Sequence, residues 1–206
     1  MKKINIKMAL KNEYTASQKE VSLIDIPKLS YLALQGIGNP NTSPMYQEVI
    51  EALYAVAYTI KFKIKKEKEI DFGVMPLETL WWLPDGEERM EEANKSNWCW
   101  ESLIMQPAFI DEQMVCEVIE EVSHKKKLVL DKAIKLKTLE EGLVMQIMHK
   151  GPYDEEQEQI ALLHQAIQEK GYRAKGLHHE IYLNDPRRTL PNNLKTIIRQ
   201  PVSLSK

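Results

Sequence analysis

The sequence predicts an α+β fold in which duplicated β-α-β-β units form an antiparallel sheet, with helices packed on one face and a central ligand groove. Short apolar runs bounded by turn residues alternate with long stretches of helical periodicity. The order strand, helix, strand, strand occurs twice, over about residues 29–106 and 143–202. With 206 residues, 43% of them hydrophobic, the chain can bury a core as a single domain over 1–206.

The first repeat follows an N-terminal arm of about residues 1–20, which is polar and mixed in composition. Apolar runs predict two short strands separated at Pro27, which cannot donate to a sheet ladder. Ser43 can cap a helix that begins at Pro44 and ends near Ile64, and its apolar residues recur at helical spacing. The strands before and after this helix are expected over 21–26, 29–37, 72–83 and 97–106.

A further helix and the second repeat complete the pattern. Asp111 can cap a helix that reaches about Lys127, and residues 129–136 connect it to the second repeat. Asp154 can cap the second repeat's helix, which Gly171 terminates. The strands of this repeat are expected over 143–149, 177–183 and 194–202.

Composition excludes several classes of protein. A net charge of -2, from 28 basic and 30 acidic residues, leaves no positive excess for a phosphate backbone, so we expect no nucleic-acid partner. Cys99 and Cys116 lack metal-ligand spacing and indicate a reduced, cytoplasmic protein. No apolar run approaches membrane-spanning length, so no membrane partner is expected. We see no residue set for a metal or another cofactor.

Residues 178–188 are the most chemically informative segment. Strand alternation places His178, Glu180 and Tyr182 on one face and the intervening side chains on the other. A carboxylate carried inward by such a strand costs free energy unless it has a partner, binds a cation or stays protonated. Because the adjacent histidines point apart, they are not expected to bind one metal ion together.

Three blocks of sequence carry a resemblance to a known family. Residues 75–82, 144–156 and 178–188, the last followed by 194–202, resemble the GyrI-like small-molecule-binding family in order and spacing. The resemblance spans nearly the whole chain. It implies a duplicated strand–helix–strand–strand unit around a ligand groove at a pseudo-two-fold axis, which agrees with the pattern of the strands and helices.

The resemblance also implies a class of function. The chain lacks a helix-turn-helix pattern and is similar to stand-alone members, among them the cyclopropanoid cyclopropyl hydrolases. These open the strained ring of DNA-alkylating compounds with paired glutamates and aromatic walls. Glu156 and Glu180 fall where that catalytic pair would be. One glutamate would accept a proton from the attacking water and the other would assist, and the sequence leaves open which does which.

Each of these residues also has an ordinary structural interpretation. Glu180 could pair with a nearby arginine or histidine, and Glu156 could simply favour the start of a helix. The aromatic residues could be core rather than ligand contacts, since rings at such spacing usually pack inside. The ligand-binding candidates are Tyr54, Tyr58, Trp82, Trp100, Tyr153 and Tyr182.

Two functions from different classes therefore remain. The first is a cofactor-independent hydrolase that acts on reactive planar molecules and protects the cell. The alternative is a non-catalytic multidrug-binding protein that sequesters or senses a hydrophobic, planar or cationic small molecule, with Glu180 as the counter-charge. A protein-binding inhibitor is a third hypothesis, although no sequence feature indicates a protein partner.

Overall fold

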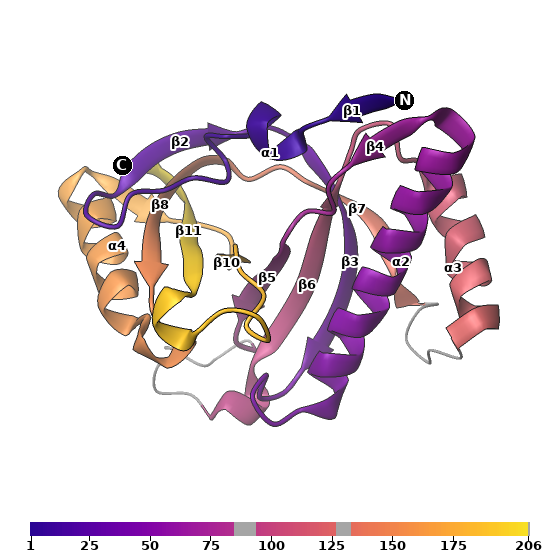
Figure 1. Cartoon of the computed structure of the whole chain (residues 1–206). Helices are drawn as coiled ribbons and strands as arrows, with labels where there is room; N and C mark the ends of the chain where they lie inside the picture. Colours follow the sequence, from indigo (N-terminus) through magenta and orange to yellow (C-terminus); the bar gives the residue numbers. More distant parts are fainter. Residues whose placement is uncertain (85–93, 127–132, 206) are drawn as a thin grey trace. The chain divides into compact units, whose positions relative to one another are not determined.

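The computed structural model describes residues 1–84, 94–126 and 133–205 (Figure 1). In these ranges the chain forms four α-helices and eleven strands, most of which pair antiparallel, so the predicted α+β class is confirmed. None of the helices in the described ranges is long and apolar enough to cross a membrane. Each predicted repeat contains one further short strand after its helix, Ile70–Phe72 in the first and Tyr172–Ala174 in the second.

The contacts divide the chain into two compact units, each assembled from three segments. The first unit comprises Met1–Ala9, Leu29–Met75 and Trp81–Leu139. The second unit comprises Leu10–Lys28, Pro76–Leu80 and Glu140–Lys206. Each unit therefore combines residues that lie far apart in the sequence.

In the first unit, β3 (Leu29–Ile37) lies between two antiparallel partners, β6 (Cys99–Gln106) and β7 (Lys135–Leu139). The helix α2 (Pro44–Lys68) packs on β3 and β6 and lies beside α3 (Glu112–Lys126) (Figure 1). The Asp111 carboxylate caps α3 by accepting a hydrogen bond from the backbone N–H of Met114 at 2.8 Å. A short parallel pair, β1 (Lys2–Ile4) with β4 (Ile70–Phe72), and α1 (Ile6–Ala9) complete the unit.

The second unit contains a sheet in the order β2 (Ser22–Ile26), β8 (Gly142–Lys150), β11 (Lys195–Leu204), β10 (His178–Tyr182). All of these pairings are antiparallel. The short strand β9 (Tyr172–Ala174) pairs with the end of β11, and β5 (Leu77–Trp82) begins in this unit. The helix α4 (Gln157–Glu169) lies against β8 and β11 (Figure 1).

The two faces of the second unit's sheet differ in chemistry. On one face α4 completes a buried apolar cluster, whose members are Met145, Ile147, Leu163, Ile167, Ile198 and Val202. Gln146 and Arg199 alternate with these strand residues and therefore point to the opposite face. There they bind backbone carbonyls of residues 12–15, so the N-terminal segment covers that face.

The structure differs from the predictions made from the sequence at several positions. The strand expected over 72–83 is interrupted between Phe72 and Leu77, where Pro76 cannot donate to a ladder. Asp154 does not cap the second repeat's helix, because a 3₁₀ turn (Tyr153–Glu155) precedes α4. The expected arm contains β1, α1 and the buried Tyr14. Ser43 lies at the N-cap of α2 without a side-chain cap bond. Lys127 and residues 129–132 of the expected helix end and connection lie outside the described residues.

Candidate functional site

Glu156 and Glu180 approach each other in the second unit. Glu156 occupies the N-cap position of α4 with helical backbone angles, and Glu180 lies at the centre of β10. The Glu156 side chain is 5% exposed, and its Oε1 has no hydrogen-bond partner among the described residues. Burial and the negative charge of Glu180 raise the pKa of Glu156 to about 9, an effect that the Thr196 hydroxyl only partly offsets. Glu156 is therefore protonated at neutral pH.

The strand register explains why these groups meet. Glu180 lies opposite Ile198 on β11, and Tyr182 lies opposite Thr196. Opposite residues of an antiparallel pair share a face, and Ile198 belongs to the apolar cluster beneath α4. Glu180 and Tyr182 therefore project to the α4 face, where Glu156 begins the helix.

Two side chains of the same strand hold the Glu180 carboxylate. The Tyr182 hydroxyl donates to Oε2 at 2.6 Å, and His178 Nε2 lies 3.1 Å from Oε1. The Tyr153 ring meets the Tyr182 ring edge-on, with centroids 5.4 Å apart and planes at 72°. Tyr153 is 38% exposed, so this pair of rings forms an accessible aromatic edge beside the carboxylate.

This site contains a proton donor and a proton acceptor of the same residue type. Protonated Glu156 can donate a proton, whereas a carboxylate at Glu180 can accept one. When the environments of two carboxyl groups move their pKa values apart, one group can donate a proton and the other can accept one. The arrangement is suited to a reaction in which one atom loses a proton while another gains one.

Comparison with known protein families gives a match over most of the chain. The model of the GyrI-like small molecule binding domain matches residues 19–203. The chain belongs to the GyrI-like family. The resemblance inferred from the three sequence blocks is thereby confirmed, together with a small molecule as the class of ligand.

Three solved structures from Listeria innocua are similar to this GyrI-like chain. An uncharacterized conserved protein is 36% identical, with a TM-score of 0.89, and covers 97% of this chain and 100% of its own. One structure described as a hydrolase is 34% identical, with a TM-score of 0.84 and the same coverage. Another hydrolase structure is 35% identical, with a TM-score of 0.86, covering 98% of this chain and 100% of its own. None of the curated protein sequences compared with the chain matches it.

Four of the aromatic candidates lie in the first unit of the GyrI-like chain. Tyr54 and Tyr58 are neighbours on α2, with ring centroids 6.2 Å apart, and Tyr58 also stacks on Phe62 at 6.4 Å. Tyr58 is 47% exposed, so these rings form an exposed aromatic row. Trp82 ends β5 and is partly exposed. The remaining two candidates, Tyr153 and Tyr182, belong to the second unit with the acid pair.

Trp100, the fourth of these residues, is fully buried. Its ring lies over Gly36, where an added Cβ would come within 2.2 Å of the ring, and it meets Tyr46 edge-on at 4.8 Å. Its indole N–H donates to the carbonyl of Gly38 at 3.1 Å. These three contacts of Trp100 come from its own unit, and its role at a ligand remains a prediction.

Sequence reasoning missed a group of four buried charges, which we call the buried ion cluster: Glu78, Glu141, His179 and Arg199. His179 Nδ1 lies 3.0 Å from Glu141, and its Nε2 lies 3.1 Å from Glu78 without hydrogen-bond alignment. Arg199 donates to Glu141 at 3.1 Å. Alternation did place His179 opposite to Glu180, but no local signal identified Glu78 or Glu141 as its partners.

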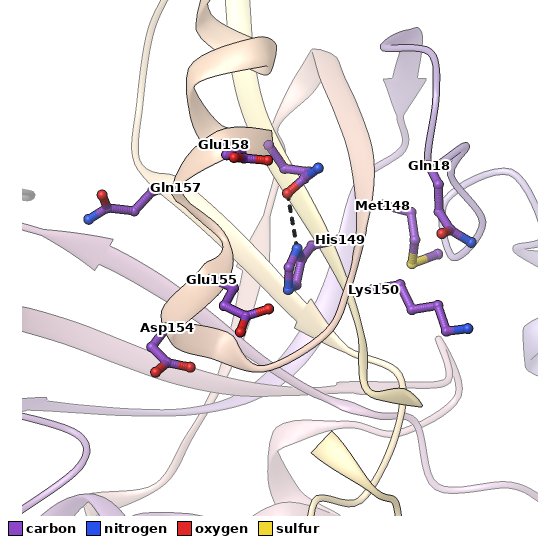
Figure 2. A pocket seen from close by; sticks show the side chains of 9 residues that line it. Gln18, Met148, His149, Lys150, Asp154, Glu155, Gln157 and Glu158 are labelled. Atoms are coloured by element: carbon purple, nitrogen blue, oxygen red, sulfur yellow. Dashed lines mark hydrogen bonds between the residues drawn. The ribbon is translucent and has the colours of Figure 1, made fainter. Parts of the chain in front are cut away.

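The second unit also contains an open hollow of about 460 Å³ beside the start of α4 (Figure 2). His149 points into the α4 side of it, where its Nδ1 lies 3.1 Å from Gln159 and its Nε2 lies 2.9 Å from the carbonyl of Pro152. Both ring nitrogens therefore have partners, and neither glutamate of the acid pair lines the hollow. Within the described ranges, no three His, Cys, Asp or Glu residues form a group that could hold a metal ion.

Proposed function

We propose that the chain is a cofactor-independent hydrolase that opens the strained cyclopropane of reactive, planar, DNA-alkylating small molecules and thereby protects the cell. The observation that carries the proposal is the acid pair, in which protonated Glu156 lies beside Glu180. The similarity to two structures described as hydrolases, at 34% and 35% identity over nearly the whole chain, supports it.

Glu156 would act as the general acid. In a cyclopropane conjugated to a carbonyl group, the electron pair of the breaking C–C bond moves toward the carbonyl oxygen, which must be neutralised. Because the pKa of Glu156 is about 9, its proton is present at neutral pH and can pass to that oxygen. Burial of the donor also excludes bulk water from the oxygen during the step.

Glu180 would act as the general base. Water attacks the ring carbon, a C–O bond forms as the C–C bond breaks, and Glu180 takes the water's proton. Tyr182 and His178, which contact the two oxygens of Glu180, would orient its lone pairs toward the water. After the reaction Glu180 holds a proton and Glu156 is ionised, and transfer between the two neighbouring carboxyl groups restores the starting state.

Ligand recognition would use aromatic surface. The edge-on pair of Tyr153 and Tyr182 lies beside the acid pair and can contact a flat ring while the hydroxyl of Tyr182 holds Glu180. Trp82, Tyr54 and Tyr58 are proposed as further ligand contacts, because each is at least partly exposed. Trp100 is proposed to act from beneath the surface, since its ring is fully buried.

The same residues also support a second candidate, a protein that sequesters or senses its ligand without turnover. A carboxylate flanked by two tyrosine rings suits a hydrophobic cation, which would gain charge pairing and cation–π contacts. In this alternative Glu180 balances charge and moves no proton.

Turnover separates the two candidates. Limiting protein is incubated with an excess of a cyclopropane-bearing, carbonyl-conjugated ligand, and ring-opened product is quantified. The hydrolase predicts product well beyond one equivalent, whereas protection that stops at one equivalent contradicts it. Glu156→Gln and Glu180→Gln should each lower turnover by at least about 100-fold with modest changes in binding. Glu155→Gln, at the exposed neighbouring position, is the matched control and should retain activity.

A further inference from the structure

The buried ion cluster and the acid pair meet on β10, where each contributes one of two adjacent residues. His179 precedes Glu180, and the two side chains point to opposite faces of the sheet. On β11, Arg199 lies opposite His179, and Gln146 on β8 lies opposite Arg199. A polar row therefore crosses three adjacent strands on the face that α4 does not cover.

The cluster is electrically balanced. The carboxylates of Glu78 and Glu141 face the cations His179 and Arg199, and each of the four residues is at most 6% exposed. The two carboxylates raise the pKa of His179 to about 9 against the opposing effect of burial. The two cations lower the pKa of Glu141 to about 2. Two negative and two positive charges cancel only while His179 keeps its proton.

Each element packed around His179 contributes a defined partner. Glu78 comes from β5, Glu141 from the residue before β8, and Arg199 from β11. Tyr14, on the N-terminal segment, donates its hydroxyl proton to Glu78 at 2.6 Å. Gln146 accepts a hydrogen bond from Arg199 at 3.1 Å. Rotation of β10 about its axis would break the contacts of His179 and turn Glu180 away from Glu156.

An unbalanced charge in the cluster would act on the acid pair through the strand. Charges on the two faces of one strand are separated by on the order of 10 Å. At an effective dielectric constant of about 20, one unit charge at that separation shifts an ionisation by about one pH unit. Solvent ions screen this effect little, since the groups are buried. A balanced cluster exerts almost no net effect, whereas an unbalanced one does.

We propose that His179 is a positioning residue for Glu180, and that the charge balance of the buried ion cluster sets the electrostatic potential in which the acid pair ionises. The reaction consequence rests on the proposed function, but the electrostatic part concerns the folded protein alone. It can therefore be measured without a substrate.

The test compares two variants that unbalance the cluster in opposite directions. His179→Gln leaves a net charge of -1, and Glu141→Gln leaves +1. Carboxyl ¹³C NMR titration of the labelled full chain should show the midpoint of the Glu156 signal higher in the first variant and lower in the second. Each shift should be about half a pH unit, because His179 of the natural protein itself loses its proton near pH 9. Both variants lose buried ion pairs, so a purely structural role predicts changes of the same sign or none.

Controls and a second variant keep the test decisive. The exposed residues His124 and Glu140 provide the matched changes His124→Gln and Glu140→Gln, which should leave the midpoint unchanged. If a single variant does not fold, Glu141→Gln combined with His179→Gln retains one charge of each sign, and its Glu156 midpoint should lie within about half a pH unit of that of the natural protein. A midpoint in the double variant that differs from that of the natural protein by about one pH unit or more overturns the proposal.

The pH dependence of turnover then connects the cluster to the reaction. The limbs of the kcat profile should move with the NMR midpoints, in opposite directions for the two single variants, while KM stays within about threefold. Opposite NMR shifts without any turnover would overturn the hydrolase and leave the electrostatic inference standing. If the protein turns over its substrate but the Glu156 midpoints of the two single variants are the same, the electrostatic inference is overturned and the hydrolase proposal stands.

Discussion

Glu156 and Glu141 are two glutamates of the same unit with almost the same burial, 5% and 6% exposed, and opposite ionisation. Glu156 has another carboxylate as its neighbour, and its pKa rises to about 9. Glu141 lies between His179 and Arg199, and its pKa falls to about 2. Since burial is equal, the neighbouring charges decide the difference. Glu141, which faces two cations, stabilises the fold, and Glu156, which faces another carboxylate, keeps a transferable proton.

The largest expected effect comes from removing a cation from the buried ion cluster. Arg199→Met should lower the free energy of unfolding by about 3–5 kcal/mol, because Glu141 then remains buried with one cation fewer. Chemical denaturation at pH 7 measures it. Arg173→Met on β9, an exposed position, is the control and should stay within about 0.5 kcal/mol. A similar loss of unfolding free energy in both variants would contradict the idea that the buried ion pairs of Arg199 cause the destabilisation.

The pH dependence of stability should reveal His179 itself. Its folded pKa lies above the unfolded value, so its stabilisation is complete below about pH 6.5 and is lost as the pH rises through about 9. Over that interval the natural protein should lose about 3 kcal/mol more unfolding free energy than His179→Gln does. Denaturant titrations at pH 6.5 and pH 9 provide the comparison. Parallel curves for the two proteins would show that His179 does not titrate in this range.

Glu156→Gln should separate stability from activity. The raised pKa of Glu156 means that the folded natural protein loses stability as the pH rises from about 4.5 toward 9. The variant avoids this loss and should be more stable by at least about 2 kcal/mol at pH 8, with no gain at pH 4, while losing its turnover. Thermal unfolding at both pH values measures the gain. A variant that is less stable than the natural protein at pH 8 would contradict the inference that Glu156 destabilises the fold at that pH.

The smallest effect is expected at the hydrogen bond that orients Glu180. Tyr182→Phe removes the donor 2.6 Å from Oε2 but keeps the ring against Tyr153. One such bond contributes about 1 kcal/mol, so turnover should fall about fivefold with little change in melting temperature. Tyr172→Phe, on β9, is the control. An unchanged kcat in Tyr182→Phe would remove the hydroxyl from the mechanism.

Local patterns predicted the fold well because they depend on neighbouring residues. Alternation assigned Glu180 and His179 to opposite faces of their strand, and helical spacing identified α2 from its start at Pro44. The helix start at α4 was predicted at Asp154 because a capping signal does not reveal the 3₁₀ turn that precedes Gln157.

The candidate site was only partly predictable. Glu156 and Glu180 came from a resemblance to a family, and their proximity follows from the register of β10 and β11. The partners of His179 could not be inferred, because Glu78 and Glu141 lie on distant segments that only the tertiary structure brings together. Long-range pairing of buried charges leaves no periodic signal in the sequence.

The contact of Arg199 with the carbonyl of Glu13 joins residues separated by 186 positions. During synthesis the N-terminal segment leaves the ribosome long before β11, so its carbonyl groups cannot bind Arg199 until β11 has emerged. Loop closure over such a length is entropically costly and slows folding. The closing of the second unit therefore follows the emergence of β11, and nascent chains that stop before Arg199 cannot complete it.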